Sequence, residues 1–156
     1  VWVYSLVAGR ENRDNCVENE HQIGLALIMY ARSNATGRFP SDLPTLIAAE
    51  ELPPIIFVCP STRDTPANRP SDLTAGRHLS YIYIGAGLTK DSPADAVALY
   101  EPLSNHDNTG SNVLFADGHV EFIPVRQAAQ LAAMAQAGIR PIYWPPHPTT
   151  QPSTQP

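Results

Sequence analysis

Residues 111–123, SNVLFADGHVEFI, constrain the fold most strongly because they read as a complete β-hairpin. The dipeptide Asp117-Gly118 tolerates the positive φ angles of a two-residue type I′ turn, and strand-forming residues flank it on both sides. Such a turn pairs Ala116 with His119 and places alternating side chains on opposite faces of the hairpin. The predicted core face carries four apolar side chains: Val113, Phe115, Val120 and Phe122.

Four further segments carry the periodicity of helices or strands. Residues 10–33 keep apolar side chains on one helical face, and residues 125–138 form an alanine-rich helix closed by a glycine. Residues 79–84 and 96–100 are rich in strand formers. A chain of 156 residues suits one domain. We therefore predict an α+β fold in which an N-terminal helix packs on an antiparallel sheet of about four strands, followed by a short C-terminal helix.

Both ends of the chain differ in composition from this predicted domain, which spans residues 10–139. Residues 1–9 are largely apolar but too short to cross a bilayer, which takes about 20 residues. Three interpretations stay open: the remnant of a membrane anchor in the precursor, an ordinary first core element, or a strand donated to a neighbouring subunit. Residues 140–156 are rich in proline and are expected to be extended. The residues predicted to mediate assembly are Val1, Trp2, Val3, Tyr4, Leu6, Tyr143 and Trp144.

The last part of this tail has the composition of a short mucin-like stalk. Hydroxyl side chains are interspersed with prolines there, which predicts an extended chain that carries O-linked sugars. The candidate glycosylation sites are Thr149, Thr150, Ser153 and Thr154.

The charge of the chain argues against a nucleic-acid partner. The formal net charge is −5, with 15 acidic residues against 10 basic ones. The basic residues are scattered and form no stripe that could release counterions from phosphates.

One group of polar residues around the hairpin is a candidate for chemistry. Asp107, Asn108 and Asp117 offer hard oxygen ligands for calcium, although the regular spacing and closing glutamate of a calcium loop are missing. Local hydrogen bonds within turns are the alternative role for these side chains. His106, Asp117 and His119 are a second candidate set, a transition-metal triad that would make the chain a metal-dependent enzyme. No cofactor is predicted beyond this calcium candidate.

Nucleophilic catalysis finds no support in the sequence. The chain has no Gly-x-Ser-x-Gly elbow, and neither of its two cysteines has a histidine close by in sequence. The sequence therefore offers no candidate for nucleophilic catalysis.

The hairpin also carries a family resemblance. In NHDNTGSNVLFADGHVEF, ten residues separate His106 from Asp117-Gly118. This arrangement resembles the C-terminal His…Asp-Gly signature of prepilin-type, pseudopilin-like proteins of planctomycete-like bacteria, in which the spacing is nine. Other segments match the same family in order: residues 15–30 (NCVENEHQIGLALIMY), 38–40 (RFP), 57–61 (FVCPS) and 80–83 (SYIY).

The resemblance implies a type IV pilin-like fold, export across the inner membrane and a location outside the cell or at its surface. It implies a structural subunit that associates with copies of itself into a filament or tube, so we predict that the protein is not an enzyme. A minor pseudopilin of a type II secretion-like machine is the first alternative, and a metal-dependent periplasmic enzyme is the second. Pseudopilins as a class sometimes hold calcium near the signature.

The exported setting implied by the resemblance also favours a disulfide between Cys16 and Cys59. Closing a loop of this size would stabilise the fold by about 4 kcal/mol in the chain-entropy picture. Two buried free thiols, which behave as small apolar side chains, are the alternative.

Overall fold

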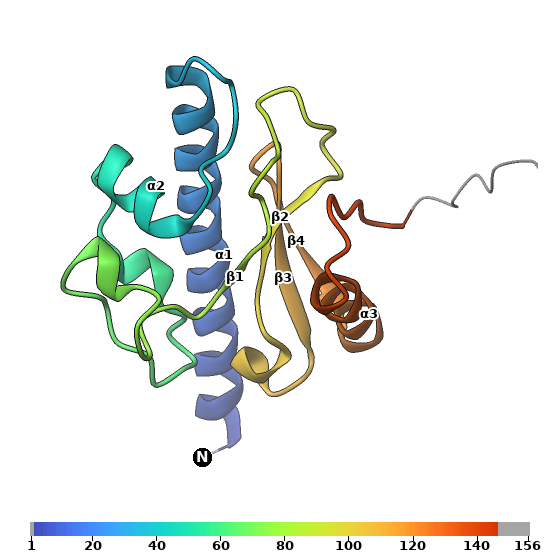
Figure 1. Ribbon diagram of the computed structural model, residues 1–156. Helices are drawn as coiled ribbons and strands as arrows, with labels where there is room; N and C mark the ends of the chain where they lie inside the picture. The colour runs from blue at the N-terminus through green and yellow to red at the C-terminus, as the bar shows by residue number, and fades with distance from the viewer. Residues whose placement is uncertain (1, 147–156) are drawn as a thin grey trace, which may run out of the picture.

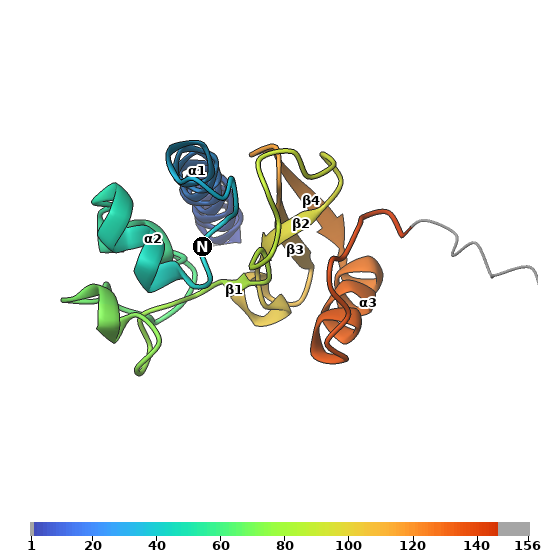
Figure 2. The same cartoon turned by 45° about the horizontal axis from the view of Figure 1, so that its top comes forward.

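The computed structural model describes residues 2–146, with side chains described from residue 11 onward (Figure 1). It confirms the predicted α+β fold: a long helix packs on one face of a four-stranded antiparallel sheet, and a short helix covers the other face (Figure 2). The elements in chain order are α1 (Trp2–Ser33), α2 (Leu43–Glu50), η1 (Pro54–Phe57), η2 (Pro70–Asp72), β1 (Ile82–Tyr83), β2 (Val97–Tyr100), η3 (Leu103–His106), β3 (Gly110–Phe115), β4 (Val120–Pro124) and α3 (Val125–Gln136).

Helices on both sides of the sheet give the protein two hydrophobic cores. The strand order is β1-β2-β3-β4, and every residue of the two central strands, β2 and β3, is buried. Leu114 packs in the core beneath α1, whereas its neighbours Val113 and Phe115 pack in the core beneath α3. This alternation lets one strand serve both cores.

The hairpin of β3 and β4 forms as predicted, but its register differs by one residue. Leu114 pairs with Val120, and the loop between the strands holds three residues, Ala116 to Gly118. Gly118 has a φ of +90°, so a three-residue loop ending in a left-handed glycine replaces the predicted two-residue turn. A slip of one residue moves the second strand's side chains to the other face. Val120 therefore packs beneath α1 and Phe122 is exposed, so the predicted core face is wrong for these two residues.

A glycine in α1 brings the helix close to this hairpin. A Cβ atom at Gly24 would lie 2.7 Å from Leu114 Cδ1 and 3.1 Å from Gly118 Cα. No larger residue fits between the helix and the hairpin loop without a shift of one of them. The sequence in this part of α1 thus sets the distance between the helix and the sheet.

The N-terminal end of α1 extends past the sheet (Figure 1). The helix begins at Trp2, so residues 2–9 are helical and the interpretation as a donated strand is wrong; Val1 lies outside the described residues. Cys16 is the first α1 side chain that is buried among those described, and Figure 1 shows the N-terminal end of the helix extending past the sheet. Within the described part of the chain, no helix combines the length and apolar character that a membrane span needs.

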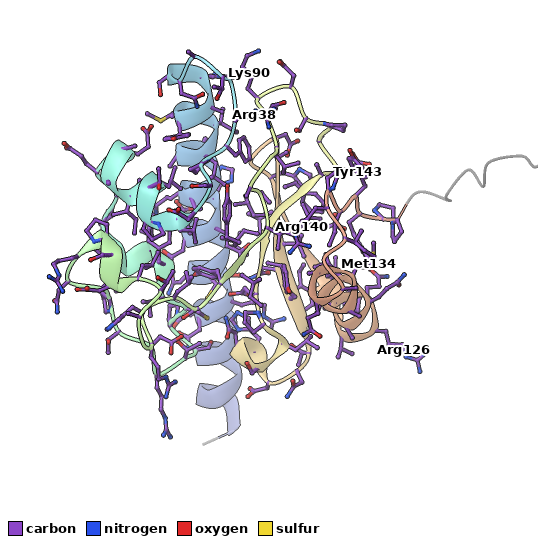
Figure 3. The ribbon with its side chains drawn as sticks, viewed as in Figure 1. Arg38, Lys90, Arg126, Met134, Arg140 and Tyr143 are labelled. Carbon is purple, nitrogen blue, oxygen red and sulfur yellow. The ribbon has the colours of Figure 1, made fainter. Side chains whose placement is uncertain are left out.

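The first residues of the predicted tail belong to the fold. Ile142 and Trp144 are buried in the core beneath α3, and the backbone N–H of Val97 donates to Ile142 O at 2.8 Å. Figure 3 shows Arg140 and Tyr143 in this returning segment, which runs back beside β2 and α3. Trp144 therefore anchors the chain's own core, not a neighbouring subunit, and the globular domain extends beyond residue 139. The four candidate glycosylation sites, Thr149, Thr150, Ser153 and Thr154, lie outside the described residues.

Candidate metal centre

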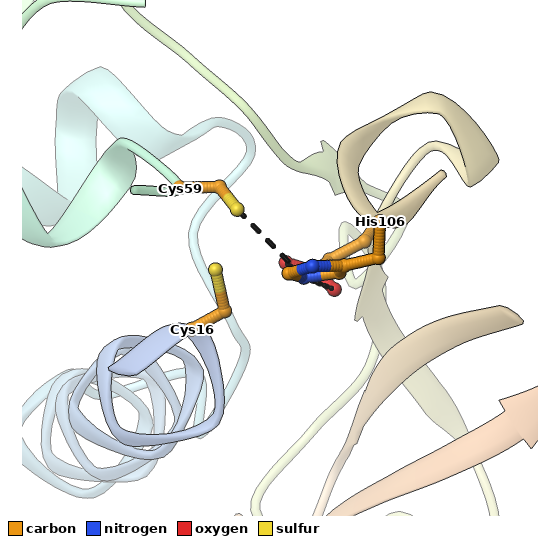
Figure 4. A group of neighbouring side chains, drawn as sticks. Cys16, Cys59 and His106 are labelled. Atoms are coloured by element: carbon orange, nitrogen blue, oxygen red, sulfur yellow. Dashed lines mark hydrogen bonds and ion pairs between the residues drawn. The ribbon is translucent and has the colours of Figure 1, made fainter. Parts of the chain in front are cut away.

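Four potential metal ligands meet between α1 and the sheet. One ligand atom from each of the four side chains lies within 4.8 Å of the other three. In the part of the chain that the structure describes, this is the group of at least three histidine, cysteine or acidic residues that could hold a metal ion. All four side chains are buried. Figure 4 shows Cys16, Cys59 and His106 pointing toward one another from three separate segments. We call this group the buried cluster; its members are Cys16, Cys59, Glu101 and His106.

Each member of the buried cluster comes from a different segment. Cys16 sits where α1 first meets the core, and Cys59 follows η1, which is closed by a hydrogen bond from Val58 N–H to Ile55 O. Glu101 comes directly after β2, and His106 ends η3. The cluster therefore lies where the long helix, a loop and the end of the central strand β2 meet.

A histidine–carboxylate pair forms one side of the cluster. His106 Nε2 lies 3.0 Å from Glu101 Oε2 and 3.2 Å from Glu101 Oε1. Ser61 Oγ lies 3.3 Å from His106 Nδ1, and the backbone N–H of Asn112 donates to Glu101 Oε2 at 3.4 Å. Burial opposes the charged imidazolium, but the hydrogen bonds with Cys59 and Glu101 outweigh it and raise the pKa of His106 to about 9.

The two sulfurs form the other side of the cluster. Cys59 Sγ lies 3.7 Å from His106 Nε2. A hydrogen bond from the Cys16 thiol, with a further contribution from His106, lowers the pKa of Cys59 to about 6 against the opposing effect of burial. The same contact with Cys59, followed by burial, raises the pKa of Cys16 far above its ordinary value. The contacts within the cluster therefore favour the charged forms of Cys59 and His106 and the neutral thiol of Cys16.

A fifth polar side chain lies one helical turn beyond Cys16. Glu20 is fully buried, and neither of its carboxylate oxygens has a hydrogen-bond partner among the described residues. Burial, and then the negative charges of Glu101 and Cys59, raise the pKa of Glu20 well above its usual value. This side of the core therefore gathers two buried acidic side chains, Glu20 and Glu101, beside the basic side chain of His106.

The structure brings the two cysteines together as the resemblance implies. Both are buried free thiols in the structure, and their sulfur atoms lie within the 4.8 Å span of the cluster. A disulfide between Cys16 and Cys59 stays a prediction.

The other predicted ligand sets are not assembled. His106 and Asp107 precede β3, whereas Asp117 and His119 follow it, so the strand separates them by about 20 Å. Asp107 and Asn108 instead form a turn with φ angles of 53° and 57°. Asp117 and His119 pair with each other at the exposed hairpin loop. Neither the calcium set nor the predicted triad forms a site in the described part of the chain.

Sequence reasoning missed Glu101 and the grouping of the cluster. Cys16 and Cys59 are far apart along the chain from each other and from His106, so only the fold brings them together. One local signal was available. Glu101 follows the apolar residues 96–100 and precedes His106 by five residues, so the two side chains can be buried together.

No family model, no curated protein and no solved structure matches this chain.

Proposed function

We propose that the protein is a structural subunit of a filament or tube outside the cell or at its surface, assembled from copies of the same chain. The observation that carries the proposal is the form of α1. This helix has 32 residues, or a length of about 48 Å at 1.5 Å per residue. Its described side chains are buried in the core from Cys16 onward, and its N-terminal end extends past the sheet, where a second subunit can meet the helix (Figure 1).

The outer face of the packed half of α1 supports the same proposal. Leu25 and Met29 are 50% and 59% exposed and lie one turn apart on this face. Side chains four residues apart on a helix form one continuous surface. This apolar pair gives a second copy of α1 a place to pack alongside the first, which suits a polymer built around its helices.

The buried cluster has a structural role in this proposal. Its four residues are at most 7% exposed. A catalytic metal site, by contrast, keeps one coordination position open to substrate. A closed set of four protein ligands is typical of sites that stabilise a fold. This is the reason to prefer a structural subunit over a metal-dependent enzyme.

Calcium is the weaker choice of metal. Calcium takes six to eight oxygen ligands, whereas two of the four ligand atoms in the buried cluster are sulfur. The oxygen-bearing residues Asp107, Asn108 and Asp117 are not gathered in one place. We therefore place any metal at the cluster and not at the hairpin.

The proposal is tested by electron microscopy of the purified chain. We expect the full chain to form long regular polymers and a variant lacking residues 1–9 to stay monomeric. The deletion should leave the domain folded, because the first described buried side chain is Cys16; circular dichroism provides this control. Polymers of the shortened chain would refute the role of the N-terminal segment.

A minor pseudopilin would behave differently in the same experiment. It would fold and bind other components without forming long polymers by itself. A second variant, Leu25→Ser with Met29→Ser, tests the helix face separately, and we expect it to shorten or abolish the polymers while the monomer stays folded.

A further inference from the structure

We propose that the buried cluster binds a single zinc ion that fastens α1 to the loop after η1 and to the end of the sheet. The inference rests on the donor atoms, their spacing and the charge around them. It does not depend on whether the chain polymerises.

The donor set matches zinc. Cys16 and Cys59 supply two sulfurs, His106 a ring nitrogen and Glu101 a carboxylate oxygen. Thiolate and imidazole ligands favour zinc over calcium and magnesium, and structural zinc sites hold four protein ligands in a tetrahedron. The exclusion of solvent from all four side chains is what a closed site requires.

The spacing of the donors is close to that of a tetrahedral site. Ligand atoms about 2.0–2.3 Å from a common zinc ion lie about 3.3–3.8 Å from one another. Cys59 Sγ and His106 Nε2 are already 3.7 Å apart, and all four ligand atoms lie within 4.8 Å of one another. The direct contact of 3.0 Å between His106 and Glu101 would lengthen slightly as both turn toward the ion.

The charge around the cluster is a second, independent observation. The Glu20 carboxylate is fully buried without a hydrogen-bond partner and lies near Glu101 and Cys59. A buried carboxylate is costly unless a cation or hydrogen bonds compensate it. A divalent cation in the cluster would supply positive charge near the Glu20 carboxylate, for which the described side chains provide no hydrogen-bond partner.

The second coordination layer is also in place. Ser61 Oγ holds the Nδ1 edge of His106, and the backbone N–H of Asn112 holds Glu101. Such outer contacts orient the ligands of metal sites. They also provide a test of intermediate strength, because Ser61 contacts the ligand His106 but is not itself a ligand.

The experiment compares zinc binding by the full chain and by matched variants. Protein purified under reducing, oxygen-free conditions is stripped of metal, loaded with zinc alone, dialysed and analysed by elemental mass spectrometry; affinity is measured by competition with a chromophoric chelator. We expect one zinc ion per chain. The near-isosteric changes Cys59→Ser and Glu101→Gln should weaken binding by more than the ~10- to 100-fold loss that is typical when an outer contact is removed.

Two controls grade the result. Ser61→Ala should weaken zinc binding by the ~10- to 100-fold typical of an outer contact, and His119→Gln should leave it unchanged because His119 lies at the far end of β3. Cobalt(II) binding to the unmodified chain gives a measurement that does not depend on the folding of any variant, and we expect the visible spectrum of tetrahedral thiolate coordination.

Three results would overturn the proposal. They are a reduced chain that retains no zinc after dialysis, a Cys59→Ser variant that is folded and binds zinc as tightly as the unmodified chain, and a Cys16–Cys59 disulfide in protein isolated from its natural setting. The disulfide would remove both sulfur ligands, so it and the zinc site exclude each other.

Discussion

Two histidine–carboxylate pairs lie at opposite ends of β3, and only one of them belongs to a candidate site. The His106 and Glu101 side chains are 5% and 0% exposed and lie beside two sulfurs. The His119 and Asp117 side chains are 47% and 45% exposed and share the hairpin loop with no third ligand in the described part of the chain. The shorter contact belongs to the exposed pair, at 2.5 Å against 3.0 Å.

The comparison teaches that burial and neighbours decide what such a pair can do. An exposed ion pair contributes little to stability because water screens it. A buried pair cannot lose one partner without leaving the other uncompensated in the core. His106 and Glu101 are therefore required by the fold around them, while the charges of His119 and Asp117 contribute little to stability.

The largest effect is expected from removing the imidazole of the buried pair. In the metal-free protein, His106→Ala should lower the free energy of unfolding by about 3–5 kcal/mol because Glu101 loses its charge partner. His119→Ala should lower it by only about 0.5–1.5 kcal/mol, the usual contribution of an aromatic pair, because its ring stacks on Phe115 with 4.3 Å between the ring centroids. Urea unfolding followed by circular dichroism measures both variants. Equal losses of unfolding free energy in the two variants would contradict the contrast between the buried and the exposed pair.

The next effect concerns the acidic residue behind the buried pair. Glu20→Gln should stabilise the metal-free protein by about 1–3 kcal/mol at pH 7, because the carboxylate has no hydrogen bond to lose. The folded-state pKa of Glu20 lies well above the unfolded value of 4.5, so its contribution to stability is full below that value and is lost as the pH rises. The gain from Glu20→Gln should therefore grow from pH 4.5 to pH 7. A gain that shrinks over this range would contradict the direction of the shift.

The stability of the loop that carries His119 and Asp117 should depend more on Gly118 than on the charges of the pair. Gly118 has a φ of +90°, and a Cβ there would lie 3.1 Å from Ile28 Cδ1. Gly118→Ala should destabilise the protein by about 1–2 kcal/mol, the usual cost of a left-handed backbone for an L-residue. Thermal or urea unfolding measures it. An unchanged free energy of unfolding would mean that the three-residue loop with a left-handed Gly118 is not the loop formed in solution.

The smallest effect is expected at the carboxylate of the exposed pair. Asp117→Asn should cost less than about 0.5 kcal/mol at pH 7. Burial raises the pKa of Asp117, but the hydrogen bonds and the charge of His119 together outweigh it and lower the pKa. The contribution of Asp117 to stability is therefore present above the unfolded value of 3.8 and is lost as the pH falls through the lower folded value. The difference between Asp117→Asn and the unmodified chain should therefore vanish in acid. A difference that persists there would assign the loss to the turn and not to the charge.

The fold was more accessible from sequence than the candidate site. Alternation in β3 and periodicity in α1 are local signals: β3 forms where it was expected, and α1 ends where it was expected but begins earlier, at Trp2. The register of the hairpin was missed because a two-residue and a three-residue loop can both place a glycine after Asp117, and the difference is decided by how Gly118 fits against α1. The grouping of Cys16, Cys59 and Glu101 with His106 has no local signal, because only the packing of α1 on the sheet creates it.

X-ray absorption spectroscopy at the zinc edge tests the central claim most directly, because it counts the ligands of the ion in the loaded protein. The buried cluster predicts two sulfur neighbours at about 2.3 Å and two nitrogen or oxygen neighbours at about 2.0–2.1 Å. A shell made only of nitrogen and oxygen would show that zinc binds elsewhere and would contradict the account.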